Sequence, residues 1–219
     1  MRDFKRNLTR AGLAMSLASV IALTGCSTPK PVEIVNAETA STVLVVPTVN
    51  KTTQVNADRL FNSLISMPFA ERGYYVYGPE TTRMIFEADG LYEPEKVQET
   101  PADQLAQLFG SDVVVKVQIH FFDTSYYLLK TRSEIRLTYQ VYDKGGNLLL
   151  NFQDDVFLDQ GGDTSSLGGL IASAITSAIS RAVNNMMPVT DLAAKRMIRG
   201  FGPGPHAIEK AVEQTQKTL

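Results

Sequence analysis

Residues 112–122, DVVVKVQIHFF, place every second side chain in one apolar row. The row consists of Val113, Val115, Val117, Ile119 and Phe121, while Lys116, Gln118 and His120 point the other way. A period of two is typical of a strand with one face in the core. Residues 133–143, SEIRLTYQVYD, repeat the alternation, and LLLNFQDDVFL follows at 148–158 after the glycine turn DKGGN. We therefore expect three consecutive antiparallel strands.

The segments before these strands alternate between strand and helix signals. STVLVVPTVN at 41–50 is a short apolar run that predicts a buried strand, which ends or lies at a sheet edge at Pro47. A helix capped by Asn56 or Asp58 should follow and break or kink at Pro68. The remaining segments predict a strand in YYVYGPE and helices over 80–88 and 101–110.

The chain after the three strands is helical in pattern. Residues 166–185 carry an apolar stripe opposite a row of serine, threonine and arginine, so we expect a helix that covers the sheet. A second transmembrane helix is the alternative, because small residues recur at helical spacing there. One more helix is expected in VTDLAAKRMIRGFG at 189–202. The whole order predicts an α+β fold in which helices pack on a mixed sheet with antiparallel C-terminal strands.

The first residues have the features of an export signal. A basic stretch up to Arg10 precedes an apolar segment at 11–23 that is too short to span a bilayer. The segment ends in Leu23-Thr24-Gly25-Cys26, which resembles the bacterial lipobox. That resemblance implies cleavage between Gly25 and Cys26, and lipidation of Cys26 by diacylglycerol and an N-acyl chain such as palmitate. The alternative is an ordinary buried cysteine.

Lipidation would fix both the location and the domain plan. Three acyl chains hold a protein on a membrane far more firmly than one chain does. The sorting rule of such lipoproteins makes Ser27 a signal for the outer membrane, with the protein on the periplasmic side. The expected plan is a signal peptide at 1–25, the acylated cysteine and a flexible tether at 26–40, one domain at 41–210 and a tail at 211–219.

Charge and cysteine content exclude several classes of function. The chain has 21 Lys+Arg and 23 Asp+Glu. Removal of residues 1–25 takes away four basic side chains and Asp3, which leaves 17 against 22 and a net charge near −5. An acidic chain without a basic cluster is not expected to bind nucleic acid. Cys26 is the only cysteine, so no disulfide is expected.

The residues that could carry chemistry are sparse. The two histidines, His120 on the polar side of a strand and His206 in a Gly-Pro loop, are not a metal-ligand pattern. Asp154 and Asp155 are adjacent on a strand, so their side chains should point to opposite faces. The glycine pairs are not followed by the Lys-Ser/Thr of a phosphate loop. We therefore expect no enzyme activity, no metal and no cofactor.

Two stretches are candidates for contact with a partner. HFFDTSYYLLK at 120–130 crowds aromatic side chains at a hairpin tip, and an exposed group of them would mark a partner surface. The alternative is that these side chains are only hairpin core. GFGPGPH at 200–206 is stiff and rich in glycine and proline. The candidate contact residues are Phe122, Tyr126, Tyr127, Pro203, Pro205 and His206.

Three motifs together resemble a proteobacterial family of lipoproteins of unknown function. They are ERGYYVYGPETTRMIFEADGLYEPEKV at 71–97, LAQLFGSDVVVKVQI at 105–119 and GFGPGPHAIEK at 200–210, and the resemblance covers residues 35–210. It departs at Phe122, where we would expect tryptophan, and at Ala207 after His206. The resemblance implies a domain similar to the N-terminal domain of TolB. It also implies a CsgG-like secretion lipoprotein and other envelope proteins as partners, by association only.

Three functions remain after these exclusions. The first is a scaffold or assembly component of an envelope secretion or transport complex, with self-association as an option. The second is a surface-contact regulator of a cell-wall enzyme such as a peptidoglycan synthase, which predicts a tether longer than the fourteen residues from Ser27 to Ala40. The third is a small-molecule-binding domain, which predicts a closed pocket with converging polar groups.

Overall fold

The computed structural model describes residues 33–126, 130–161 and 186–210. The chain divides into two compact units, Met1–Val32 and Glu33–Leu219, and all described residues belong to the second. Several sequence predictions lie outside the described residues: the signal peptide with Gly25, Cys26 and Ser27, the residue Tyr127, the helix over 166–185 and the tail at 211–219.

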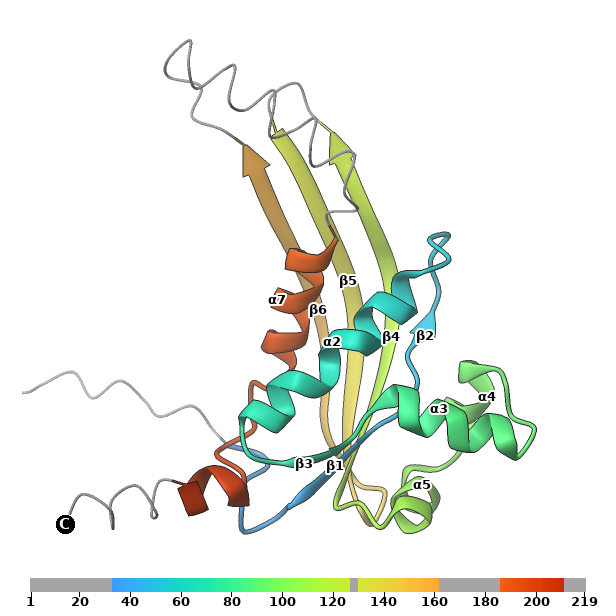
Figure 1. Cartoon of the computed structure of the whole chain (residues 1–219), viewed down its shortest axis with the longest axis vertical. Helices are drawn as coiled ribbons and strands as arrows, with labels where there is room; N and C mark the ends of the chain where they lie inside the picture. Colours follow the sequence, from blue (N-terminus) through green and yellow to red (C-terminus); the bar gives the residue numbers. More distant parts are fainter. Residues whose placement is uncertain (1–32, 127–129, 162–185, 211–219) are drawn as a thin grey trace, which may run out of the picture. The chain divides into compact units, whose positions relative to one another are not determined.

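The described residues form one mixed sheet of six strands, in the order β3-β1-β4-β5-β6, with β2 also paired to β4 (Figure 1). The pairings of β1 with β3 and of β1 and β2 with β4 are parallel, whereas β4-β5 and β5-β6 are antiparallel. The strands are β1 Thr42–Val45, β2 Val49–Asn50, β3 Tyr75–Tyr77, β4 Val113–Tyr126, β5 Lys130–Asp143 and β6 Leu148–Gly161. The predicted α+β class is confirmed.

Helices lie on both faces of this sheet. They are α2 Ala57–Glu71, α3 Pro79–Ala88, α4 Pro94–Glu99, α5 Ala102–Phe109 and α7 Met187–Met197. Helices α2 and α7 lie side by side across the first face (Figure 1), and their side chains Phe61, Ile65, Val189 and Met197 join the main core cluster. Helices α3, α4 and α5 bury Phe86, Val97 and Leu105 against Leu44 and Val114 on the second face.

Helix α2 differs from the sequence prediction at both ends. Asn56 makes no side-chain cap, and the helix runs through Pro68 to Glu71 without a break. Proline removes one backbone donor and clashes with the carbonyl one turn earlier, so it costs most in a helix interior. Pro68 lies in the last turn, only three residues before the helix ends, and its side chain is buried. Burial against the core therefore offsets the local cost.

A β-bulge at His120 changes which side chains of β4 face the core. The pairing of β4 with β5 shifts register between Ile119 and Phe121. The sequence prediction placed Phe121 in the apolar row, and that placement is wrong. Phe122 takes the core position and is 6% exposed, while Phe121 turns to the second face. A bulge adds one unpaired residue, so every side chain beyond it changes face.

The bulge divides the three long strands into two parts. The inner half comprises 113–119 of β4, 137–143 of β5 and 148–154 of β6. The outer half comprises 121–126, 130–136 and 155–161, and these segments end at the tips of the strands (Figure 1). Among the described residues, no helix is long and apolar enough to cross a membrane.

Candidate interaction surfaces

The described ranges contain no group of three or more histidine, cysteine, aspartate or glutamate residues able to hold a metal. His120 lies on the second face and its Nε2 is 2.9 Å from the Thr138 hydroxyl. His206, which the sequence pattern predicts to lie in a loop, lies in the helical stretch 205–210, with Nδ1 3.5 Å from the Glu209 carboxylate. The two histidines sit on different elements, each with a local partner, so this part of the chain brings no catalytic pair together.

Asp154 and Asp155 point to opposite faces of β6, as the strand geometry predicts. Asp154 is buried on the first face, and its carboxylate lies 3.3 Å from Nη1 of Arg196 on α7. Asp155 is exposed and pairs in register with Arg136 on β5. The two carboxylates therefore share neither a site nor a proton.

The second face of the outer half carries two arginine–aromatic stacks, and we call this surface the open face. The Arg136 guanidinium lies 4.3 Å from the ring centre of Phe121, and that of Arg132 lies 3.9 Å from the ring centre of Phe157. Glu134 lies between the two arginines, 3.2 Å from Nε of Arg136 and 3.9 Å from Nε of Arg132. Each stack joins neighbouring strands, so the surface is held by side chains as well as by the backbone.

The open face is exposed and carries more acid than base. The Phe157 side chain is 49% exposed. The carboxylates of Asp123, Glu134, Asp155 and Asp159 surround the two guanidiniums. Arg132 lies 3.9 Å from Asp159, but no ion pair of Asp123 or Asp155 is present within the described ranges. Arginine and aromatic side chains already held in place lose little conformational entropy on docking, which is typical of protein contact sites.

The aromatic contact group predicted near the hairpin tip is only partly described. Phe122 lies in the main core cluster and is buried, so its prediction as an exposed partner contact is wrong. Tyr126 is the last residue of β4, but its side chain lies outside the described residues, as does Tyr127. Sequence reasoning missed two exposed rings of the open face. The bulge at His120 turns Phe121 to the opposite face, and Phe157 lies on β6, two strands from β4.

Residues 200–206, which we call the C-terminal clasp, join three distant segments of the chain. The Gly200 carbonyl accepts hydrogen bonds from the backbone N–H groups of Ile34 and Val35, at 2.7 and 3.1 Å. The Gly204 N–H donates to Arg72, and the His206 N–H donates to Gly73. The clasp therefore ties the first described residues to the turn between α2 and β3.

Close packing explains the glycines of the clasp. A Cβ on Gly204 would lie 2.5 Å from the Gly73 carbonyl oxygen, closer than van der Waals contact permits. Phe201 packs edge-on against Phe69 and Tyr74, with ring centres 5.0 and 5.8 Å apart. The Tyr74 hydroxyl donates to the carbonyls of Val35 and Gly202. Burial raises the pKa of Tyr74 to about 12. The positive charge of Arg72 opposes this rise in pKa, and the negative charge of Glu33 adds to it.

The clasp bears on two sequence predictions, the contact residues at 203–206 and the tether at 26–40. Pro203 and His206 are exposed and Pro205 is half-buried, so the motif presents them while its glycines and Phe201 hold the fold. The predicted tether to Ala40 is too long, because Val35 and Ala40 are both buried in the main core. Backbone pairing with the clasp fixes the chain from Ile34 onward.

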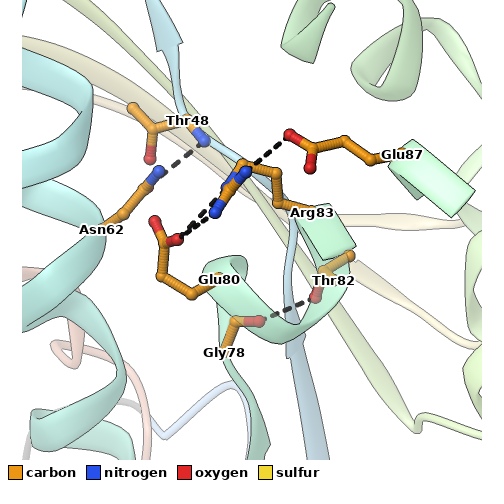
Figure 2. Close-up of polar contacts among 7 residues, drawn as sticks. All are labelled: Thr48, Asn62, Gly78, Glu80, Thr82, Arg83 and Glu87. Carbon is orange, nitrogen blue, oxygen red and sulfur yellow. Dashed lines mark hydrogen bonds and ion pairs between the residues drawn. The ribbon is translucent and has the colours of Figure 1, made fainter. Parts of the chain in front are cut away.

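A buried polar junction lies where Pro47 separates β1 from β2. The Asn62 side chain on α2 accepts a hydrogen bond from the Thr48 N–H at 3.3 Å (Figure 2). The Gln98 amide on α4 donates to the carbonyls of Pro47 and Val117, at 2.9 and 2.7 Å. These side chains replace the ladder hydrogen bonds that proline interrupts. The junction therefore has a structural role.

Helix α3 and strand β4 each carry a cation held by neighbouring groups. Arg83 lies between Glu80 and Glu87 on the surface of α3 (Figure 2). Lys116 is 9% exposed on the second face, and its Nζ donates to the carbonyls of Gln98 and Thr100, at 2.7 and 2.6 Å. Burial lowers the pKa of Lys116. The last carbonyls of a helix lack hydrogen-bond partners within the helix. Lys116 supplies such a partner at the end of α4 and so holds that end against the sheet.

A groove of about 760 Å³ lies between the start of α2, the outer half of β4 and Met186. Val55, Leu60 and Phe122 supply apolar lining, while Arg59 and Asp123 supply charge. Its rim reaches Met186, the first described residue after the segment 162–185. Thr53, Gln54, Asn56 and Thr124 add uncharged polar groups to this lining.

Comparison with known proteins settles the family. The model of the family described as "Putative lipoprotein GNA1162-like" matches residues 34–204. The chain belongs to this family. The match begins at Ile34, where pairing with the clasp begins, and ends at Gly204 within the clasp. As a member of this lipoprotein family, the protein has a membrane-anchored location in the cell envelope, and the family description names no catalytic activity.

The chain is also similar to individual proteins. The chain is 24% identical to "Putative lipoprotein NMB1124/NMB1162" of Neisseria meningitidis serogroup B, over 90% of this chain and 97% of that one. It is 25% identical to the crystal structure of lipoprotein GNA1162 from Neisseria meningitidis, which covers 64% of this chain and 99% of that one at a TM-score of 0.48. The PelC dodecamer structure from Paraburkholderia phytofirmans matches 74% of this chain and 89% of its own at 10% identity and a TM-score of 0.42.

Proposed function

We propose that this lipoprotein is a non-catalytic assembly component of an envelope secretion or transport complex. Lipid on Cys26 anchors it to the outer membrane on the periplasmic side, and Ser27 directs it there. Its partner, a CsgG-like lipoprotein or another envelope protein, docks on the open face. The partner class follows from the resemblance described above, and the docking surface follows from the contacts of the outer half.

The observation that carries this proposal is the pair of stacks Arg136–Phe121 and Arg132–Phe157, on a face that no helix among the described residues covers. Helices α3, α4 and α5 pack over β1 and the start of β4, and their cluster includes no residue of the outer half. An ordered, half-apolar surface with excess carboxylate fits a protein partner that brings basic side chains. A catalytic role has no comparable support, since each histidine has only a local contact.

The regulator hypothesis requires a longer tether than this chain provides. Eight residue steps separate Cys26, the lipid attachment point, from Ile34, which is paired to the clasp. Fully extended, they reach about 26 Å at ~3.3 Å per residue. A regulator that contacts a synthase across the periplasm needs a longer reach, so we rank this alternative second.

Site-specific photo-crosslinking in living cells tests the docking surface. A photoreactive phenylalanine analogue replaces Phe157 on the open face, and the matched control replaces Tyr92, an exposed aromatic residue between α3 and α4. We expect the Phe157 probe to crosslink a CsgG-like lipoprotein or another secretion component, and the Tyr92 probe not to do so. The crosslink should weaken with Asp155→Lys, which places a cation where a basic partner is expected to meet a carboxylate.

Two outcomes would contradict the proposal. Equal crosslinking from both positions would mean that the open face is not the docking surface. Capture of a peptidoglycan synthase from Phe157 would favour the regulator hypothesis. A Cys26→Ser variant serves as the anchoring control: if it fractionates with the membrane as the wild type does, lipid on Cys26 is not the anchor.

A further inference from the structure

The distance between the lipid and the folded domain is limited by covalent length. Cys26 is eight residues from Ile34, and a fully extended chain of that length spans about 26 Å. Release of Ile34 from the domain would cost free energy, because its N–H donates to the Gly200 carbonyl at 2.7 Å and Val35 beside it is buried. The part of the domain around Ile34 must therefore stay within this distance of the lipid.

The part around Ile34 is a defined end of the sheet. Segments 33–35, 72–75 and 200–208 meet there through the hydrogen bonds of the clasp. In Figure 1 the first described residues, in blue, and the residues after α7, in red, lie at the end of the sheet away from the tips of β4, β5 and β6. We call this region the clasp end. The open face lies on the outer half, toward the opposite end.

The exposed side chains of the clasp end combine apolar groups with balanced charge. Ile34, Tyr75 and Ile208 are 37%, 54% and 48% exposed. The charged residues in and beside the three segments are Arg72, Arg199 and Lys210 against Glu33, Glu71 and Glu209. The net charge is therefore zero. Apolar side chains near the interface gain from contact with lipid, and a neutral surface neither needs anionic lipid nor is repelled by it.

We propose that the clasp end rests on the lipid surface, with Ile34, Tyr75 and Ile208 at the level of the headgroups. This inference rests on the lipid anchor at Cys26 given above under the proposed function. The tether brings the clasp end to the membrane, and contact of its apolar side chains with lipid stabilises that position. The occupant of this surface is thus a phospholipid bilayer and not a second protein.

The proposed orientation places the open face away from the bilayer. Strands β4, β5 and β6 each contain 14 residues. At ~3.3 Å per residue such a strand is about 46 Å long. When the clasp end lies on the membrane, the outer half projects into the periplasm, where the stacks of the open face meet a partner that need not touch the lipid.

Tryptophan fluorescence gives a direct test, because the chain contains no tryptophan. Single variants Ile208→Trp and Tyr75→Trp place a reporter at the clasp end. The matched control is Val55→Trp, which is 84% exposed and precedes α2, whereas Gly73 follows that helix. A helix of 15 residues is about 22 Å long, so Val55 and Gly73, which is close to Tyr75 in the chain, lie beyond opposite ends of α2.

The full-length acylated protein is reconstituted into phosphatidylcholine vesicles with or without brominated acyl chains, which quench tryptophan at short range. We expect brominated lipid to cause a loss of emission from Ile208→Trp and Tyr75→Trp and no loss from Val55→Trp. High salt should leave this difference unchanged, because the clasp end has no net charge to screen. Two reporters are used because either substitution alone could disturb the local packing.

The outcomes separate this inference from the proposed anchor. If the protein floats with vesicles but the two clasp-end reporters are not quenched, or Val55→Trp is quenched equally, the orientation is wrong while the anchor stands. If the full-length protein does not float with vesicles, the anchor at Cys26 fails and the orientation fails with it. If the quenching difference disappears in high salt, the clasp end contacts lipid through charge and not through its apolar side chains. That result would overturn the proposal.

Discussion

The inner and outer halves of β4 belong to one continuous strand but have different surroundings. In the inner half, Val114 and Val115 face opposite sides of the sheet and both are fully buried. In the outer half, Phe122 is buried on the first face, whereas Phe121 and Asp123 are not. Among the described residues, helices cover the start of β4 on both faces, whereas they cover its outer half on the first face only.

The difference shows how the strand is stabilised where none of the described helices covers it. On the second face of the inner half, Leu44 and Val114 pack against Phe86 and Leu105. On the same face of the outer half, guanidiniums take the place of helices, since Arg136 covers Phe121 and Arg132 covers Phe157. Each stack shields part of a ring while leaving the rest exposed. The inner half of β4 is therefore buried on both faces, whereas the outer half combines one buried face with one exposed face.

Two adjacent phenylalanines give the largest expected contrast. Phe122→Ala removes a buried ring and should lower the free energy of unfolding by about 3–5 kcal/mol. Phe121→Ala loses one exposed stack with Arg136 and should cost less than about 1 kcal/mol. Urea denaturation of both variants, monitored by circular dichroism, measures the difference.

The sign of this contrast tests the bulge itself. Without a register shift at His120, Phe121 would share the row of Ile119 and the order of the two effects would reverse. A larger loss for Phe121→Ala would therefore contradict the placement of both rings. It would also remove Phe121 from the open face and with it one of the two stacks.

Local patterns in the sequence predict most of the fold. The alternation in 112–119 and 133–143 identifies β4 and β5 and assigns Glu134 and Arg136 to the outward face. Pro47 correctly marks the end of the first strand, since β1 stops at Val45 and β2 begins at Val49. These features depend on neighbours along the chain, which is why periodicity and proline chemistry reveal them.

Features that depend on distant segments could not be predicted. The bulge at His120 is set by the register between two strands, and no glycine marks it. The pairing of Ile34 with Gly200 joins residues at opposite ends of the domain, so the residues after Val32 read as a tether. The stack of Arg132 on Phe157 crosses from β5 to β6. Each of these features belongs to the surfaces proposed as functional.

A buried and an exposed polar contact give the next contrast. Asn62→Ala leaves the buried Thr48 N–H without its acceptor and should cost about 1–3 kcal/mol in unfolding free energy. His120→Ala removes an exposed contact with Thr138, and water can replace the lost partner, so a loss below about 0.5 kcal/mol is expected. The same urea series measures both variants. Equal losses would mean that burial does not set the cost of losing these two contacts.

The smallest expected effect is a pH dependence that belongs to Lys116 in the inner half. Burial lowers its pKa in the folded state below the ordinary 10.5. Between the lowered value and 10.5, the unfolded chain binds more protons than the folded chain does, so rising pH stabilises the folded state. The difference in unfolding free energy between wild type and Lys116→Met should therefore move in favour of wild type as pH rises toward 10.5. At neutral pH the difference should be constant.

A neighbouring substitution separates this titration from general alkaline effects. Gln118→Met changes a side chain on the same face of β4 but removes no ionisable group, so its difference from wild type should stay flat over the same pH range. A slope shared by both variants would mean that the pH dependence comes from elsewhere in the chain. A slope confined to Lys116→Met would show that helix α4 buries a cation in the inner half. The guanidiniums of the outer half, by contrast, remain on an exposed face.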